Sequence, residues 1–130
     1  MKLLITKSIQ AAEFEAHQEI FTLEVIKAAA KKAIQGLGNT IKNASKVSGT
    51  QLKKMNLTTS GGAGRVLFLL KVGKNKAVLV MLRPKNDKQI GANMSIENAK
   101  FKQALEKNID MILEDLKAGH YEEIDLATVA

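Results

Sequence analysis

The sequence is short of the residues that most often build covalent, redox or metal-binding sites. It contains no cysteine, no tryptophan and only two histidines in 130 residues. The missing cysteines exclude disulfide bonds and thiolate chemistry, and they are typical of a cytosolic protein. A metal centre built on histidine needs a ligand spacing that two isolated histidines do not provide. We therefore expect neither a metal nor a small-molecule cofactor.

Long hydrophobic runs are also missing. The longest candidates, near Val66 and Ala77, have the length of a strand, whereas a membrane helix needs roughly 18–20 apolar residues. The segment from Met1 to Lys7 lacks the long apolar region of a signal peptide. The apolar fraction of 45% is ordinary for a globular chain. We expect one domain over residues 1–130, located in the cytoplasm, with no membrane partner.

Acidic residues are nearly absent from the middle of the chain. From Val25 to Lys88 there are fourteen lysines or arginines and one acidic residue, Asp87. The other acids lie before Val25 or after Lys88, and the net charge is +7. A basic block of this kind indicates a phosphate-rich partner such as nucleic acid, or an acidic protein; the alternative is a basic surface without a ligand.

A predicted β-hairpin forms the centre of this basic block. Two apolar runs, Val66 to Leu70 and Ala77 to Leu82, are separated by the polar turn residues 73–75. Arg65 precedes the first run and Arg83 follows the second. Because these positions lie at the same end of an antiparallel pair, we expect the two arginines to face one patch.

The remaining pattern predicts an α+β fold. Strands are expected over Lys2 to Lys7 and Gln51 to Thr59, and a helix from Ile9 to about Ile34 with a possible break near residues 19–22. A second helix should begin at Ser95 or Asn98 and end at Gly119. We expect a small antiparallel β-sheet with the N-terminal helices packed on one face and an additional C-terminal helix. Two segments stay open: 39–50 as a helix, loop or lid, and the tail 119–130 as an edge strand or a flexible end.

The glycine cluster 60–64 before the hairpin predicts a bend or a close approach of the backbone to a bulky group. It lacks the ending of a phosphate-binding Walker loop and is not followed by a helix, as a dinucleotide fingerprint requires.

Arginine and lysine are the side chains best suited to the chemistry that this chain could carry out. The acids are explained by solvated helix faces, and pairing His17 with His120 is a weak hypothesis. Guanidinium groups can stabilise charge that grows on a phosphodiester, and a lysine near other cations can assist proton transfer. We therefore assign Arg65, Arg83 and Lys85 as candidate catalytic residues. The candidate nucleic-acid-binding residues are Lys53, Lys54, Lys71 and Lys88. The alternative interpretation of each lysine is a solvated strand end.

The segment Gly61-Gly62-Ala63-Gly64-Arg65-Val66-Leu67-Phe68 resembles the "SGG-x-R-V-I-Y" element of the RelE/HigB/ParE superfamily of bacterial toxins. The order of elements over roughly residues 1–90 is similar as well. The resemblance implies a twisted antiparallel sheet, cleavage of mRNA on the ribosome and a cognate antitoxin as partner. The family's strand-opening arginine falls on Arg65, and its second basic residue falls on Arg83 or Lys85. Phe68 stands where many members have tyrosine, and no tyrosine or histidine follows Arg83.

Three functions remain open from the sequence. The first is a ribosome-dependent mRNA endoribonuclease of a toxin–antitoxin system, which inhibits translation. The second is a nucleic-acid-binding protein that uses the same basic surface without cleavage. The third is a gyrase-inhibiting toxin of the ParE type, which shares the fold.

Overall fold

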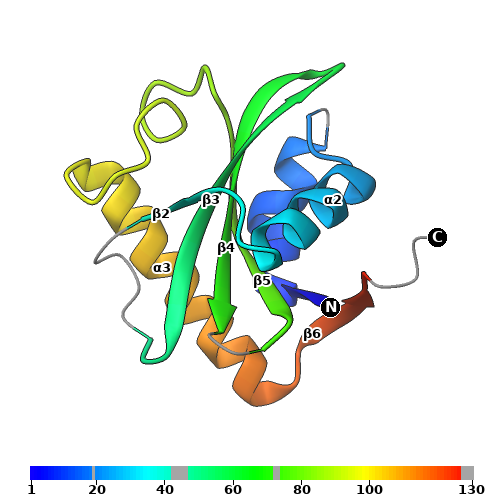
Figure 1. Ribbon diagram of the computed structural model, residues 1–130. Helices are drawn as coiled ribbons and strands as arrows, with labels where there is room; N and C mark the ends of the chain where they lie inside the picture. Colours follow the sequence, from blue (N-terminus) through cyan, green and yellow to red (C-terminus); the bar gives the residue numbers. More distant parts are fainter. Residues whose placement is uncertain (19, 42–46, 72–73, 127–130) are drawn as a thin grey trace.

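The computed structural model describes residues 1–18, 20–41, 47–71 and 74–126 (Figure 1). Its elements in chain order are β1 (Lys2–Thr6), α1 (Lys7–Ile9), a π-helical turn (Gln10–Phe14), a 3-10 turn (Glu15–His17), α2 (Leu23–Ile34), β2 (Asn39–Thr40), β3 (Thr50–Thr59), β4 (Gly62–Lys71), β5 (Lys76–Pro84), α3 (Ala99–Ala118) and β6 (Tyr121–Asp125).

The strands form one six-stranded mixed sheet in the order β2-β3-β4-β5-β1-β6. The pairs β2–β3, β3–β4, β4–β5 and β1–β6 are antiparallel. The predicted hairpin is the pair β4–β5. The prediction of a wholly antiparallel sheet is wrong at one pair, because β1 runs parallel to β5. The helical segment 7–34 lies between β1 and the strands that follow, so the chain can return to the sheet in the same direction as it left.

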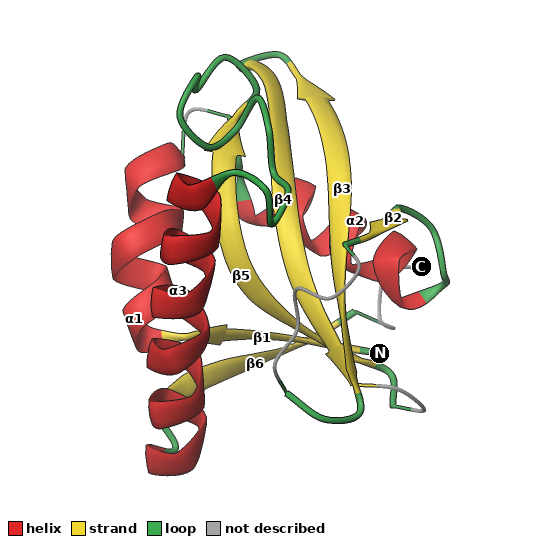
Figure 2. Cartoon of the chain, turned by 90° about the vertical axis from the view of Figure 1, so that its left-hand side faces the viewer, coloured by secondary structure: helices red, strands yellow, loops and turns green. Residues whose placement is uncertain are grey.

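Helices cover both faces of this sheet, which corrects the expectation of helices packed against one face. α2 contacts β3, β4 and β5, whereas α3 contacts β5 and β1. Figures 1 and 2 together show α3 on one side of the strands and α2 on the other. The central strands are therefore buried on both faces, and this explains why their sequences are continuous apolar runs instead of alternating patterns.

On the α2 face of the sheet, the aromatic ring of Phe21, which lies just before α2, packs closely on the backbone of β4 at Gly64. Phe21 is fully buried, and a Cβ atom added to Gly64 would clash with its ring. The prediction that the glycine cluster lets a bulky group come close is confirmed at this position. Since side chains alternate along a strand, Val66 and Leu70 share this face with Gly64, and Arg65 points to the α3 side.

The central hairpin contains a β-bulge. Leu67 pairs with Met81 and Phe68 pairs with Leu79, so Val80 has no partner on β4. The extra residue brings Leu79 and Met81 onto opposite faces of the sheet, although they are two positions apart. A bulge also bends its strand and increases the local twist. The bulge therefore lies between the half of β5 that pairs with β1 and the half that contains Arg83.

Side chains complete the sheet edge where β1 leaves β5. The parallel pairing ends at Leu4 and Val78, so the following residues of β5 are paired with β4 on one side and have no strand on the other. The carbonyl oxygen of Val80 accepts a hydrogen bond from Nδ2 of Asn108 in α3 (2.9 Å). The backbone N–H of Leu82 donates to Oε1 of Glu13 in the π-helical turn (3.0 Å). Two polar side chains thus take the place of a strand, which satisfies backbone groups that burial would otherwise leave unpaired.

The predicted helix boundaries are largely confirmed. The first helical segment is interrupted before α2, whose N-terminal Thr22 accepts a hydrogen bond from the backbone N–H of Val25 (3.3 Å). Asn98 caps α3 by accepting from the backbone N–H of Lys100 (3.1 Å), and Gly119 follows its last turn. None of the helices in the described part of the chain is both long and apolar enough to cross a bilayer.

The two segments that the sequence left open have different outcomes. Residues 121–125 form the edge strand β6, antiparallel to β1, so this part of the tail belongs to the sheet. Residues 127–130 lie outside the described residues. In the other segment, Asn39 and Thr40 form β2 and pair with Lys54 and Lys53, whereas residues 42–46 lie outside the described residues.

Candidate functional site

The hairpin register places the two predicted arginines directly opposite each other. Arg65 on β4 is the partner of Arg83 on β5, near the end of the sheet that also carries the β3–β4 turn. The expectation that both positions lie at the same end of the sheet is confirmed. Their guanidinium groups, however, have different surroundings, and those surroundings decide what each can bind.

Arg83 is engaged by acidic partners of its own chain. Its Nη1 forms an ion pair with Oε1 of the buried Glu13 and donates to the carbonyl oxygen of Leu82 (2.7 Å). Its Nε lies 3.7 Å from Oδ2 of Asp87. The side chain is only 16% exposed. In this structure Arg83 closes the sheet edge together with Glu13, and contact with a substrate phosphate would compete with that ion pair.

Arg65 holds the loop that follows β5. Its Nη1 donates to the carbonyl oxygen of Gly91 (2.8 Å), 26 residues further along the chain. Gly91 packs so closely on the backbone of Pro84 that a Cβ atom would clash there. The Nε of Arg65 is buried and has no hydrogen-bond partner among the described residues. Arg65 therefore has one structural contact and one unused donor.

Lys54 lies on the same face as Arg65. Arg65 pairs with Asn56 on β3, so Lys54 is its diagonal neighbour two positions along, where Cα atoms lie about 7–8 Å apart. Burial and then the positive charge of Arg65 lower the pKa of Lys54 below its ordinary value. Among the described residues no carboxylate forms an ion pair with either side chain.

Lys54 and Arg65 form the strongest candidate anion site of the basic block. Two neighbouring cations without an acidic partner repel each other in the folded chain, and a bound anion relieves that repulsion. A guanidinium group and an ammonium group at this spacing suit the phosphate backbone of a nucleic acid. We call this pair the phosphate site.

Lys85 and Lys88, the other predicted residues at this end of the sheet, are both exposed. Lys85 is exposed and lines a cleft of about 300 Å³ together with Ile20 and the glycine turn 61–62, while its backbone N–H donates to Ala63. Lys88 is exposed in the loop between β5 and α3. Both residues lie within five positions of Arg83 along the chain, but no hydrogen bond fixes either ammonium group within the described residues.

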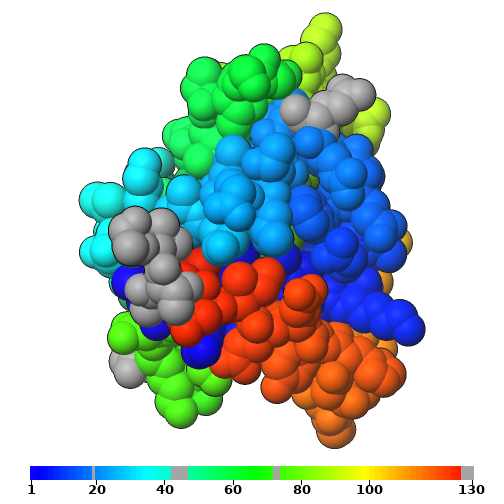
Figure 3. Space-filling view, turned by 90° about the vertical axis from the view of Figure 1, so that its right-hand side faces the viewer, coloured from blue at the N-terminus to red at the C-terminus, as the bar shows by residue number. Residues whose placement is uncertain are grey.

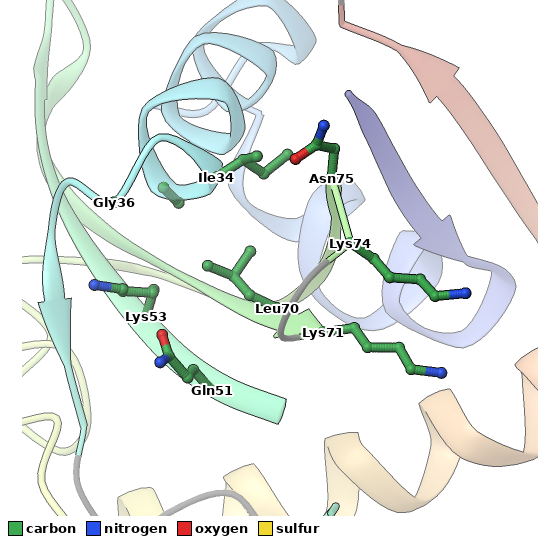
Figure 4. Close-up of a pocket in the computed structure, with 9 residues that line it drawn as sticks. Ile34, Gly36, Gln51, Lys53, Leu70, Lys71, Lys74 and Asn75 are labelled. Atoms are coloured by element: carbon green, nitrogen blue, oxygen red, sulfur yellow. The ribbon is translucent and has the colours of Figure 1, made fainter. Parts of the chain in front are cut away.

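The remaining two predicted lysines lie in a different place. Lys53 and Lys71 line a groove of about 360 Å³ between the C-terminal end of α2 and the sheet, and Lys74 lines it as well (Figure 4). Lys53 is the neighbour of Lys54 in β3 and so points to the α2 face. Lys71 lies six positions after Arg65 in β4, which corresponds to roughly 20 Å along the strand. The structure thus divides the seven predicted residues between two regions instead of gathering them in one patch.

Histidine and tyrosine side chains lie apart from the phosphate site. His120 and Tyr121 line a cleft beside Ile5 and Gln10, near the edge strand β6. His17 lines a separate cleft that includes Pro84, and its Nδ1 lies 3.0 Å from the carbonyl oxygen of Glu13. Since a carbonyl oxygen only accepts, Nδ1–H of His17 is the donor in this contact.

Sequence reasoning missed Glu13 and Asn108. These residues fix the end of the sheet that carries Arg65 and Arg83, which we call the arginine end. The sequence predicts a solvated helix glutamate at Glu13, yet this residue is 3% exposed and bonds to Leu82, Arg83 and Asn108. A signal was present in the helical period, because Glu13 lies four positions after the buried Ile9 and so shares its face of a helix. No signal in the sequence indicated that Asn108 would reach the backbone of β5.

No family model, curated protein or solved structure matches this chain. The fold and the geometry of the basic residues therefore carry the functional argument.

Proposed function

We propose that the protein is the toxin of a bacterial toxin–antitoxin pair, of the RelE/HigB/ParE type, and that it acts on mRNA at the ribosome. The observation that carries the proposal is the phosphate site, where Lys54 and Arg65 share one face of the sheet without an acidic partner among the described residues. The order of elements supports it. A strand and helices precede three antiparallel strands, and the second of these contains the arginine of the family-like segment.

The chemistry proposed for this site is stabilisation of charge on a phosphodiester. Arg65 keeps one guanidinium edge on Gly91, which fixes the orientation of its plane. Lys54 stands beside it with a lowered pKa, so this lysine gives up a proton more readily than an exposed one. Attack by the RNA's own 2′-hydroxyl also needs an in-line arrangement of the reacting groups. In this proposal the ribosome holds the message in that arrangement. A cognate antitoxin is the proposed partner that silences the activity.

Induced expression in bacterial cells tests the proposal. The wild-type chain should arrest growth, and Lys54→Gln and Arg65→Gln should each relieve the arrest while circular dichroism shows an unchanged fold. Lys102→Gln, an exposed lysine on α3, is the matched control and should remain toxic. Arg83→Ala is a poor test, since it leaves the buried Glu13 without its cation and threatens the fold. A harmless wild-type chain would refute the toxin proposal.

A second candidate function is nucleic-acid binding without cleavage. It is favoured by the ion pair that occupies Arg83 and by the distance of His120 and Tyr121 from the phosphate site. Primer extension on ribosome-bound message separates the two, because cleavage creates new 5′ ends and binding alone does not. A DNA supercoiling assay identifies the third possibility, a gyrase-directed toxin: inhibited supercoiling with intact message would favour it over both.

A further inference from the structure

The groove between α2 and the sheet combines an apolar floor with cationic rims. Its volume is about 360 Å³. Residues from α2 and β4 make the floor, namely Ala33, Ile34 and Leu70. The rims carry three lysines, and none of the nine lining residues is acidic. Figure 4 shows Lys71 and Lys74 extending together on one side of Leu70, while Lys53 extends on the other side.

This arrangement suits an extended, amphipathic anion better than a compact one. The ammonium groups do not converge on a single point, so no single phosphate can be held by all three lysines. An apolar group that lies on Ile34 and Leu70 would have cations on both of its flanks. Its complement is a ligand with an aliphatic stripe and negative charges on either side.

The floor of the groove favours a peptide over a polynucleotide as this ligand. The groove lies at the C-terminal end of α2, where the carbonyl oxygens of Lys31, Lys32 and Ala33 already accept hydrogen bonds from the backbone N–H groups of residues 35–37. Recognition therefore depends on the side chains that line the groove. The floor is aliphatic, whereas single-stranded nucleic acids bind through aromatic rings on which their bases stack.

We infer that this groove binds an acidic, amphipathic segment of a second protein. Glutamate or aspartate side chains of the segment pair with Lys53 on one rim and with Lys71 and Lys74 on the other. A leucine-sized side chain lies between them on Ile34 and Leu70. Gln51 and Asn75, which also line the groove, offer amide groups to the backbone of the segment.

The inference does not rest on the proposed function. Lys53 and the groove lie on the α2 face of the sheet, whereas Lys54 and Arg65 lie on the α3 face. Loss of peptide binding and loss of nucleic-acid binding should therefore follow from different substitutions. A negative result for peptide binding therefore does not contradict the proposed function, and a negative result for the proposed function does not contradict peptide binding.

The test uses the full chain and a fluorescein-labelled twelve-residue peptide with leucine at every fourth position and glutamate elsewhere. Fluorescence anisotropy should show saturable binding to the wild type. Lys71→Glu combined with Lys74→Glu should weaken binding about tenfold or more. Both lysines are exposed, so the double variant should fold normally by circular dichroism. The matched control combines Lys102→Glu with Lys107→Glu on α3, which changes the net charge equally and should weaken binding less than about twofold.

A second peptide with serine in place of leucine tests the apolar floor, and it should bind about threefold more weakly or worse. Three results would overturn the inference. Equal weakening in the two double variants would indicate attraction to net charge alone. Equal binding of the leucine and serine peptides would remove the role of Ile34 and Leu70. A single-stranded oligouridylate that displaces the peptide, and that loses affinity only in the Lys71/Lys74 variant, would make the groove a nucleic-acid surface.

Discussion

The carboxylate of Glu13 connects three segments that are distant in the sequence. One oxygen accepts from the backbone N–H of Leu82 and pairs with Arg83, and the other accepts from Nδ2 of Asn108 (3.3 Å). The π-helical turn, β5 and α3 thus meet at a single buried charge. A buried carboxylate with this number of donors stabilises the fold only while all of its partners remain in place.

We predict that Glu13→Gln destabilises the protein by about 2–4 kcal/mol, because it removes the buried counter-charge of Arg83 and leaves only the more distant Asp87 (3.7 Å). Urea unfolding followed by circular dichroism measures the change. Glu15→Gln, two positions away and exposed, is the control and should change the free energy of unfolding by less than about 0.5 kcal/mol. Equal stability of the Glu13 variant and the wild type would show that the ion pair contributes nothing to folding.

Substitution of Lys54 should stabilise the fold and weaken binding. Its ammonium group is partly desolvated and close to Arg65, so Lys54→Met should raise the free energy of unfolding by on the order of 0.5 kcal/mol. The same substitution should weaken binding to single-stranded RNA in a filter-binding assay. A pH series gives a further check. Because the folded pKa is below the unfolded one, wild-type stability should rise as the pH increases through the folded pKa, and the methionine variant should lose this rise.

At the level of elements, the junction between α1 and the end of α3 carries a charge-dependent contact. Oδ2 of Asp115 accepts a hydrogen bond from the backbone N–H of Ser8 (2.8 Å) at the start of the first helical segment. This hydrogen bond is the main reason why the pKa of Asp115 lies below its ordinary value, although burial acts in the other direction. The carboxylate also compensates the positive end of that helical segment.

The lowered pKa of Asp115 predicts a pH dependence. Its stabilisation is present above the unfolded pKa of about 3.9 and is lost as the pH falls through the lower folded value. Unfolding measured from pH 6 down to pH 2 should therefore show a loss of stability that Asp115→Asn reduces. Asp110→Asn, on an exposed position of the same helix, should leave the wild-type profile unchanged. Identical profiles for the wild type and Asp115→Asn would contradict the prediction.

Elements with strong local signals were predictable from the sequence. The hairpin followed from two apolar runs around a polar turn, and α3 followed from its apolar spacing and the cap at Asn98. The direction of β1 was not predictable, since parallel and antiparallel pairing use the same apolar residues and the choice depends on how the helices return the chain. β6 was also ambiguous. Its residues are acidic and mostly exposed, and they are held by pairing with β1 and by ion pairs to Lys2 and Lys76.

For the whole molecule, the basic block should produce strongly salt-dependent binding to nucleic acid. If Lys54 and Arg65 each neutralise one phosphate of a single strand, the wild-type slope of log K against log salt includes about −0.7 for each of them. Lys54→Gln should make the slope less steep by about that amount, whereas Lys102→Gln should not change it. Anisotropy titrations of a labelled oligouridylate over a range of salt concentrations provide the measurement. An unchanged slope in Lys54→Gln would remove this lysine from the interface.

The distribution of the basic residues over the molecule was only partly visible in the sequence. Composition alone indicates a basic middle, and the strand period places Lys53 and Lys54 on opposite faces once β3 is accepted as a strand. Which face each lysine takes depends on where the helices pack, and local pattern contains no such information. The same holds for Arg83, because its ion pair depends on a glutamate 70 positions earlier in the chain.

The bulge at Val80 sets the direction in which the arginine end of the sheet points. Val80 has no partner on β4, and the pairs on either side of it, Leu67–Met81 and Phe68–Leu79, are already consecutive on β4. A chain without Val80 would keep every one of these pairings, including Arg65 opposite Arg83, but would lose the bend. The orientation of Arg65 and Arg83 relative to the other half of the sheet thus depends on the length of one strand, and a chain that lacked only this residue would present the same side chains in a different orientation.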